Sequence, residues 1–456
     1  MRVTLNKSEP QPPSTAAKPP IFRRAASRRN NSWELAWAHL RRNAARVTAG
    51  GYWTDELPRG IRSNLRWFWF DGVFAQASEV ILTNYLSLFV LALGATAAQI
   101  GLINALSNLS AAALLLPGAA LVERWGHRKR LVVFSGGGMA RLIILMLALL
   151  PLGFSGPAAI TIAIGLAVVR SAFANLSLPA WVSLTADIVP LQWRGRYLSA
   201  RNMAMTVIGI VILYPAGLLI TRIGGLAGYQ TVLGLAFAIS LISTFSFNRL
   251  EEAPASVRPA SSRGPQESVW QILSEHPNFL AFSATAALWN FSLNIAGPFF
   301  NPYLVEGLKA DAGTVGALNV ITALTALAGQ RLFGRLVDRL NPRRVQLICG
   351  LLIPVLPLAW LLVRSPWHVV PINLASGFLW AGYDLASFNF LLRLIPEGRR
   401  ERYSAVYQIV VTVALAGGAA LGGLVATRFG YMAIFVLSGI GRLMAALLFA
   451  RLVRQC

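Results

Sequence analysis

The stretch GAALVERWGHRKR, from Gly118 to Arg130, separates two long apolar segments and ends in a basic cluster. A similar stretch, GRLVDRLNPRR, runs from Gly334 to Arg344, again between apolar segments. At an offset of 215 residues, LVER aligns with LVDR and Arg128 aligns with Arg343. A second pair, PLQWRGRY at 190–197 and PEGRRERY at 396–403, matches at an offset of 206. The chain therefore contains an internal repeat.

Apolar residues dominate the chain outside these stretches. Of 456 residues, 55% are hydrophobic and 13% are charged, about half the charged fraction of a soluble domain. The apolar runs are long enough to cross a bilayer as helices, and they are continuous, which argues against both a soluble enzyme and a transmembrane barrel. We predict twelve spans, at 67–92, 97–121, 131–152, 157–181, 197–221, 227–248, 277–303, 312–336, 344–363, 367–392, 403–427 and 430–451.

The repeat divides the spans into two sets of six. Repeats separated by an even number of spans run in the same sense and are related by an axis along the membrane normal. We predict an all-α polytopic membrane protein with two pseudo-symmetric six-helix bundles, at 61–248 and 276–456, and a polar linker at 249–275. Residues 1–60 form a basic tail, largely disordered, in which 32–48 is either an interfacial helix on anionic headgroups or a solvated segment. An Arg-rich organellar targeting segment is a further alternative for the tail.

Basic residues are unevenly distributed between the two sides of the predicted membrane. Of 41 Lys and Arg residues, 32 fall in the tails, the linker and the loops of one side, and 4 fall in the opposite loops. Because cytoplasmic loops are enriched in Lys and Arg, both termini are predicted to lie in the cytoplasm, in a protein of the cell (inner or plasma) membrane. The same rule explains the net charge of +23, so we expect no nucleic-acid partner.

The repeated loop resembles the G-x-L-x-D-R-x-G-R-R/K motif of the major facilitator superfamily. The motif positions are Gly118, Glu123, Arg124, Gly126, Arg128 and Lys129 in the first copy, and Gly334, Asp338, Arg339, Arg343 and Arg344 in the second. The resemblance covers about residues 65–453 and implies the twelve-helix fold of these secondary transporters. An acid at a helix end facing arginines would form a latch at the cytoplasmic rim that favours one of two conformations. Alternatively, these arginines only follow the charge rule for loops.

Polar residues recur at helical spacing inside two spans. In the first span they are Gln76, Glu79 and Thr83; in the seventh they are Asn290, Asn294 and Asn301, with Gly297 in the position that corresponds to Glu79. Residues three, four and seven apart share one helix face. We expect both faces to line a central cavity; of these two faces, only that of the first half carries a carboxylate.

Charged residues within the predicted spans are the main functional candidates. Glu79, Arg141, Arg170 and Asp384 lie near mid-span, where an ionised group needs a partner or a wet cavity. Arg170 resembles the fourth-span arginine of the superfamily, which implies proton coupling through a nearby carboxylate. We predict a Glu79–Arg170 pair in which the carboxylate takes up a proton when the arginine withdraws; a static structural ion pair is the alternative.

Further charges lie in the predicted spans outside that set. Asp71 is interpreted as an entrance charge, and Arg201 and Arg331 as residues that snorkel to the cytoplasmic surface. Arg442 lies in the last span, away from the helices that usually line the cavity, and receives no role.

Aromatic residues accompany the polar ones in the second half. Trp289 precedes Asn290, and Trp380 and Tyr383 precede Asp384. Aromatic rings beside a few polar groups suit an organic solute, and a cationic one could stack on them. Since Trp and Tyr are also ordinary residues of membrane helices, packing is the alternative role.

We therefore expect a secondary active transporter of a small organic solute that works by alternating access, with protons as the coupling ion, and that functions as a monomer. The alternatives are an uncoupled facilitator and a non-transporting sensor or scaffold. The sequence carries no catalytic constellation, no phosphate-binding G-x-x-x-x-G-K-[ST] loop and only four scattered histidines, so we predict no enzyme, no cofactor and no metal.

Overall fold

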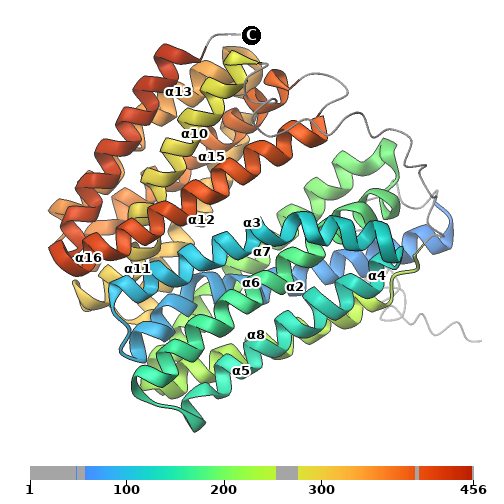
Figure 1. Ribbon diagram of the computed structural model, residues 1–456, viewed down its shortest axis with the longest axis horizontal. Helices are drawn as coiled ribbons and strands as arrows, with labels where there is room; N and C mark the ends of the chain where they lie inside the picture. The colour runs from blue at the N-terminus through green and yellow to red at the C-terminus, as the bar shows by residue number, and fades with distance from the viewer. Residues whose placement is uncertain (1–47, 49–56, 253–275, 396–399, 454–456) are drawn as a thin grey trace, which may run out of the picture. The chain divides into compact units, whose positions relative to one another are not determined.

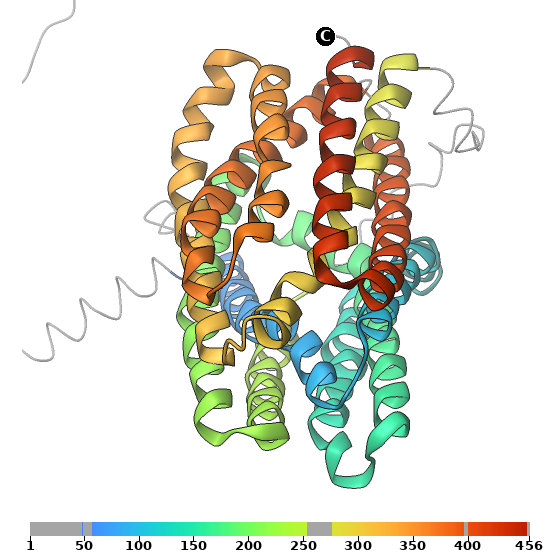
Figure 2. The same cartoon turned by 90° about the vertical axis from the view of Figure 1, so that its left-hand side faces the viewer.

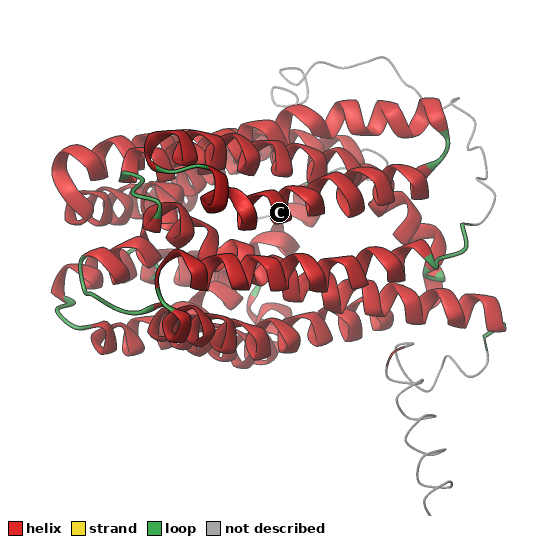
Figure 3. Ribbon diagram, turned by 90° about the horizontal axis from the view of Figure 1, so that it is seen from below, coloured by secondary structure: helices red, strands yellow, loops and turns green. Residues whose placement is uncertain are grey.

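The computed structural model describes residue 48 and residues 57–252, 276–395 and 400–453. Most of the basic tail, including the proposed interfacial helix at 32–48, and most of the linker lie outside these residues. Within them the chain consists of helices joined by short loops (Figure 3). Residues 57–252 are called the first half below, and residues 276–453 the second half.

The helices match the predicted spans closely. The first half contains α2 (Arg59–Ala92), α3 (Ala97–Trp125), α4 (Arg128–Leu131), a π-helical stretch (Val132–Met139), α5 (Ala140–Gly153), α6 (Gly156–Ile188), a short 3-10 turn (Leu191–Trp193), α7 (Arg194–Ile223) and α8 (Gly225–Asn248). The second half contains α10 (Pro277–Ala296), α11 (Phe300–Glu306), α12 (Ala312–Leu340), α13 (Pro342–Leu352), α14 (Val355–Ala359), α15 (Val369–Leu394) and α16 (Arg400–Leu452), with 3-10 turns at Gly297–Phe299, Trp360–Leu362 and Pro366–His368.

Ten helical stretches of the described residues are long and apolar enough to cross a membrane. The last of them, within α16, is 50 residues long. At Gly430 its backbone leaves the helical region (φ 79°, ψ 176°), so α16 is two helices joined at the predicted boundary between the last two spans. Helix α15 has 26 residues but is not among the ten. The fold class is thus confirmed as polytopic and all-helical, while the count of twelve spans remains a prediction.

The helix ends follow from local sequence. Thr96 begins α3 with a reciprocal capping box to Gln99, which satisfies two backbone donors. Gly126 ends α3 in the left-handed conformation with φ of 64°, which a glycine adopts without strain. The residue at the corresponding place in the second half, Asn341, also has a positive φ of 70°. The repeated loop motif therefore keeps its backbone geometry although its glycine is replaced.

The helices of each half pack mainly on one another, and the two groups are visible in Figures 1 and 2 as blue-to-green and yellow-to-red ribbons. Helix α2 packs on α8 and α3 on α6, while α10 packs on α16 and α12 on α15. Between the halves, α3 packs on α16 and α7 on α12. Glycines permit this close contact: a Cβ at Gly101 would lie 2.5 Å from the carbonyl oxygen of Ala419.

Contact between the halves is concentrated at one end of the helices. A shared apolar core there joins Tyr85, Phe89 and Ile220 of the first half to Phe299 and Val315 of the second. The remaining apolar clusters each belong to a single half. One, in the first half, contains Leu65, Phe68 and Tyr197. The two others lie in the second half; the first consists of Phe279, Phe282, Phe390, Leu391, Ile395, Tyr403, Val406, Phe449 and Val453, and the second of Trp289, Phe333, Val345, Cys349, Ile353, Leu356, Ala386, Ala445 and Ala446. The shared end is the one that the basic-residue count assigns to the side opposite the cytoplasm.

Candidate functional site

A cavity of about 340 Å³ lies among helices α2, α5, α6, α7 and α8 of the first half. Five charged side chains line it, namely Asp71, Glu79, Arg141, Arg170 and Arg201. The π-helical stretch Val132–Met139 supplies part of the wall through Gly136 and Gly137. The glycines there allow the stretch to pack closely against α6, because a Cβ at Gly136 would lie only 2.7 Å from Ser177 Oγ. We call this space the first-half cavity.

Glu79 and Arg170 form the ion pair that the sequence predicts. Arg170 Nη1 lies 3.2 Å from Glu79 Oε2, and Nη2 lies 3.3 Å from Oε1. The side chain of Arg170 is 16% exposed and that of Glu79 is 44% exposed. This two-pronged arrangement matches the fork of a guanidinium to a carboxylate, and the carboxylate remains accessible from the cavity. The role of the pair in coupling stays a prediction.

Asp71 and Arg201 form a second, more deeply buried ion pair. Arg201 Nη2 lies 3.4 Å from Asp71 Oδ2, and the two side chains are 4% and 10% exposed respectively. Ser243 donates a hydrogen bond to Asp71, and Arg201 also donates to the carbonyl oxygen of Phe68. The expectations of an entrance charge and a snorkelling arginine are therefore wrong: each group finds its partner on a neighbouring helix rather than at the surface.

Gly72 makes this second pair sterically feasible. A Cβ at Gly72 would lie 2.4 Å from the guanidinium carbon of Arg201. Arg201 also lies over the ring of Phe68 at 4.2 Å, a cation–π arrangement. Gly72 of α2 therefore leaves room for the side chain of Arg201 of α7.

We expect Asp71→Ala to destabilise the protein strongly. Removal of one partner leaves the other charge buried and unpaired, which costs about 3–5 kcal/mol. The apparent melting temperature of the purified protein should fall by more than about 5 °C. In a double-mutant cycle, Asp71→Asn combined with Arg201→Gln should cost less than the sum of the single changes. Additive losses would contradict the pairing.

Arg141 lines the first-half cavity close to the Glu79–Arg170 pair. Its Nε atom is buried and has no hydrogen-bond partner among the described residues. Within the described part of the chain, no carboxylate lies within the 4.0 Å ion-pair distance of Arg141. With two carboxylates and three arginines, the first-half cavity therefore carries an excess of positive charge.

A second cavity, of about 460 Å³, lies among the helices of the second half. Asp384 of α15 and Arg442 of α16 both line it, together with the amides Asn301, Asn319 and Asn373. We call this space the second-half cavity. Arg442 had no role at the level of sequence, because a residue's place in the last span does not reveal which way its side chain points. The one feature of the sequence that could have marked Arg442 as a candidate site residue is its charge inside an apolar segment.

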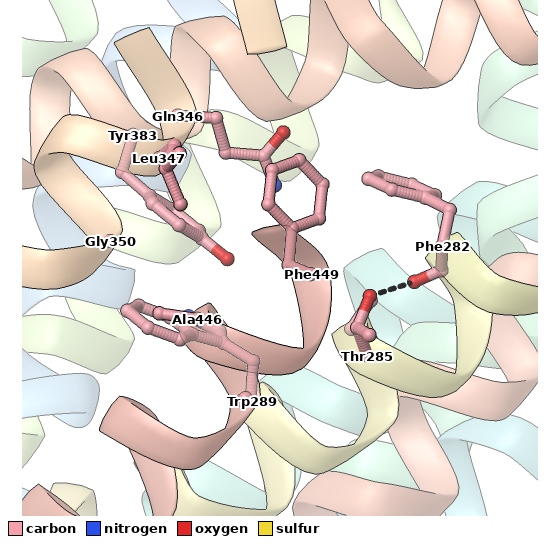
Figure 4. Close-up of a pocket in the computed structure, with 11 residues that line it drawn as sticks. Phe282, Thr285, Trp289, Gln346, Leu347, Gly350, Tyr383, Ala446 and Phe449 are labelled. Atoms are coloured by element: carbon pink, nitrogen blue, oxygen red, sulfur yellow. Dashed lines mark hydrogen bonds between the residues drawn. The ribbon is translucent and has the colours of Figure 1, made fainter. Parts of the chain in front are cut away.

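The three candidate aromatic residues pack against one another. The rings of Trp289 and Tyr383 stack with centroids 4.4 Å apart, and Trp380 lies edge-on to Trp289 at 6.0 Å. Figure 4 shows Trp289 and Tyr383 beside Gln346 and Phe449 around a space of only about 10 Å³, which is the volume of roughly one water molecule. Trp380 also borders the second-half cavity, so only this ring keeps its place as a candidate for solute contact.

The predicted polar faces serve different purposes in the structure. Gln76 lines a third cavity of about 660 Å³, which is bordered by residues of both halves, including Asn202 and Gln330. Thr83 donates a hydrogen bond to the carbonyl oxygen of Glu79, one turn earlier in α2. The latter contact is local and leaves the role of Thr83 as a prediction.

The three second-half amides all donate to backbone carbonyl oxygens, and one of them also lines a cavity. Asn290 donates to the carbonyl oxygen of Ala286 within its own helix, and Asn294 donates to that of Leu415 in α16. Asn301 lines the second-half cavity. The shared spacing in α2 and α10 therefore does not produce equivalent cavity walls.

An asparagine cluster joins the halves where they meet. Asn319 of α12 donates to Asn84 Oδ1 at 3.1 Å and to Asn301 Oδ1 at 3.3 Å. Asn301 also donates to the backbone oxygen of Asn84. Asn84 lies in the first half and the other two in the second. The cluster therefore links both halves to the edge of the second-half cavity.

In the first copy of the loop motif, Arg128 is the central residue. It forms ion pairs with Asp187 at the end of α6, at 2.6 Å, and with Glu252 after α8, at 3.2 Å. Lys129 donates to the carbonyl oxygen of Leu250. Neither acid is among the candidate residues identified from the sequence; both lie a few residues beyond the end of a predicted span. The side chain of Glu123 lies outside the described residues, and Arg124 is exposed.

The second copy of the loop motif uses its arginine differently. Arg343 donates to the carbonyl oxygens of Ala450 and Val453 at the end of α16, where a cation offsets the negative end of the helix dipole. Gly334 is half-buried in α12, and Arg344 is exposed. The side chains of Asp338 and Arg339 lie outside the described residues. The corresponding arginines of the repeat therefore have different partners. Arg128 pairs with two carboxylates, whereas Arg343 bonds to the carbonyl oxygens at a helix end.

We expect Arg128→Ala to lower the rate of transport about tenfold while the protein remains folded. The arginine, at the start of α4, links the end of α6 to the segment after α8, but the side chain of Asp187 is 44% exposed, so the loss of stability should be only about 1 kcal/mol. Flux into proteoliposomes and elution from size exclusion would measure both. The control is Arg130→Ala, at an exposed neighbouring position. Wild-type flux in Arg128→Ala would contradict a role in the conformational cycle.

Comparison with known proteins identifies relatives of two kinds. Autophagy-related protein 22-2 of Aspergillus clavatus is 26% identical over 138 residues, which cover 27% of this chain and 23% of that protein. Autophagy-related protein 22-1 of Neosartorya fischeri is 25% identical over a stretch of the same length. The match thus spans about a quarter of the length of these curated relatives.

Solved structures share the fold over most of the chain. A variant of the nucleoside transporter NupG has a TM-score of 0.69 at 13% identity, covering 85% of this chain and all of the other (100%). A D-xylose-proton symporter has a TM-score of 0.67 at 14% identity, covering 87% and 98%. A family model described as the Major Facilitator Superfamily matches residues 68–300 and 286–455. Because this match includes both halves and nearly all of the helices, the chain belongs to the major facilitator superfamily of membrane transporters.

Proposed function

We propose that the protein is a secondary active transporter that moves a small organic solute across the membrane by alternating access, driven by a proton gradient. The observation that carries this proposal is the Glu79–Arg170 pair, held at 3.2 Å on the wall of the first-half cavity. An ionisable pair inside a membrane helix bundle is costly to retain without a function. The symporter among the structural neighbours is itself named for proton coupling.

The pair provides a physical route to coupling. While Arg170 stays within reach, Glu79 is held as a carboxylate by the facing positive charge. When α2 and α6 shift relative to each other, the carboxylate loses its partner and accepts a proton from the cavity, which removes the buried charge. Return of Arg170 expels the proton. Proton uptake and release are thereby tied to two arrangements of the helices.

Contacts at one end of the halves support alternating access. The hydrogen bonds between the halves, in the described residues, join Asn84 to the asparagines of the second half, Ala98 to Thr427, and Gly313 to Thr221. All of these residues lie at the end that we assign to the outside. The third cavity, between the halves, lies on the opposite side of that contact. In the proposed orientation, we interpret this arrangement as a state closed to the outside and open to the cytoplasm.

The proposal includes a location in the cell or plasma membrane, cytoplasmic termini and a monomeric, non-enzymatic carrier. Anionic lipid headgroups would attract the basic tail. An uncoupled facilitator is the alternative if the ion pair is only structural. A sensor or a scaffold is the other alternative, but a protein of that kind needs no accessible carboxylate in a cavity.

Solute flux into proteoliposomes tests the proposal. A thermal-shift screen first selects solutes that stabilise the purified protein. Uptake of the selected solutes is then measured with and without an imposed pH gradient. Accumulation that requires the gradient supports a proton-coupled transporter. Equal flux in both conditions indicates a facilitator, and the absence of flux for every stabilising solute indicates a sensor.

A further inference from the structure

We propose that the second-half cavity binds a zwitterionic solute, with Arg442 holding its anionic group and Asp384 its cationic group. The inference rests on the proposed transport function and names the substrate class. It starts from two opposite charges that line the same cavity without forming an ion pair with each other.

Arg442 is a buried cation with few partners. The residue is 2% exposed, and its Nη2 donates one long hydrogen bond, 3.4 Å, to the carbonyl oxygen of Leu293. Its Nε is buried and has no partner among the described residues. A guanidinium carries five N–H donors and keeps its charge, so an unpaired one in an apolar bundle is strongly destabilising. The group is therefore suited to an anion that enters the cavity.

Asp384 offers the complementary charge. It is exposed and lines the same cavity from α15. In the described part of the chain, no basic side chain lies within the 4.0 Å ion-pair distance of its carboxylate, and that includes Arg442. A solute that carries both signs would therefore have a partner for each of its charges on the wall of this cavity.

The rest of the wall suits a compact polar molecule. Amide and hydroxyl groups of Asn301, Asn319 and Ser376 can bond to a polar solute, and the rings of Trp360 and Trp380 border its apolar part. The volume of about 460 Å³ lies within the range of small-molecule sites, roughly 300–1,000 Å³. A solute with one charge would leave either Arg442 or Asp384 without a partner, and a site that presents both charges therefore discriminates against that solute.

The test uses straight-chain solutes that differ only in their end groups. For each chain length from two to six carbons, an ω-amino acid is compared with the carboxylate and the amine of equal length, by thermal shift and by flux into proteoliposomes. We expect at least one ω-amino acid to stabilise the full-length protein and to be transported at least tenfold faster than both matched compounds.

Two variants assign the charges. Arg442→Gln should lower transport of the preferred ω-amino acid at least tenfold and remove its advantage over the matched amine. Asp384→Asn should lower transport similarly and remove the advantage over the matched carboxylate. Arg442→Lys, which keeps the charge but loses the planar fork, should lower transport less than Arg442→Gln. The control is Arg451→Gln, an exposed arginine of the same helix, which should leave transport unchanged.

The outcomes separate this inference from the proposed function. Transport of xylose or uridine, or of a singly charged compound, in preference to every ω-amino acid overturns the zwitterion assignment and leaves the transporter proposal standing. Unchanged selectivity in both Arg442→Gln and Asp384→Asn overturns the assignment of the charged groups. Absence of flux for every solute overturns the proposed function and this inference together.

Discussion

We expect Glu79→Gln to abolish solute accumulation driven by a pH gradient, with a loss of at least tenfold in the steady-state ratio of inside to outside solute. Glutamine retains the shape and a hydrogen-bond acceptor for Arg170, but it cannot bind and release a proton. Exchange of labelled for unlabelled solute, without a gradient, should persist because that reaction needs no net proton movement. Uptake at several external pH values and exchange at one pH would measure both effects.

The matched control for Glu79 is Glu306→Gln. Glu306 ends α11, is exposed, and its carboxylate contacts the hydroxyl of Tyr431, so the same chemical change is made away from the charged cavities. That variant should accumulate solute normally. If Glu79→Gln kept the pH dependence of the unmodified protein, the Glu79–Arg170 pair would be structural and the coupling carboxylate would have to be another residue.

We expect Gly217→Val to slow transport strongly by hindering the closure of the end where the halves meet. A Cβ at Gly217 would lie 2.3 Å from the carbonyl oxygen of Ala312 and 2.5 Å from the hydroxyl of Tyr85. Overpacking of this kind costs about 1–3 kcal/mol, and a branched side chain against backbone falls at the upper end. Applied to one of two conformations, that cost shifts their ratio roughly 5- to 150-fold. Flux should therefore fall at least tenfold.

A cross-link reports the position of the halves in that variant. Cysteines placed at Asn84 and Asn319, which touch across the interface, with Cys349 and Cys456 changed to Ser, should form a disulfide readily in the unmodified background and slowly in Gly217→Val. The control is Gly165→Val, because a Cβ at Gly165 meets no atom within 4 Å. Equal cross-linking in Gly217→Val and Gly165→Val would disprove a conformational effect.

The helical framework was predictable from the sequence because its determinants are local. Hydropathy over about 20 residues sets each span, and capping residues such as Thr96 and Gly126 set the ends. At the offset of 215 residues from Gly126, Asn341 also has a positive φ. The prediction of the Glu79–Arg170 contact came from the family resemblance, since no local pattern states which helices are neighbours.

Which charges meet was decided by the tertiary structure. Arg201 pairs with Asp71, 130 residues away in the chain, and Arg128 pairs with Asp187 and Glu252, which lie outside the loop motif. Trp289 and Tyr383 stack on each other beside a space for about one water, and Arg442 reaches a cavity that its span gave no reason to expect. The amino-acid sequence determines where each helix runs and which residues share its faces, because both depend on near neighbours. The direction in which each face points, and hence every pair and cavity, depends on how the helices rotate and pack against one another.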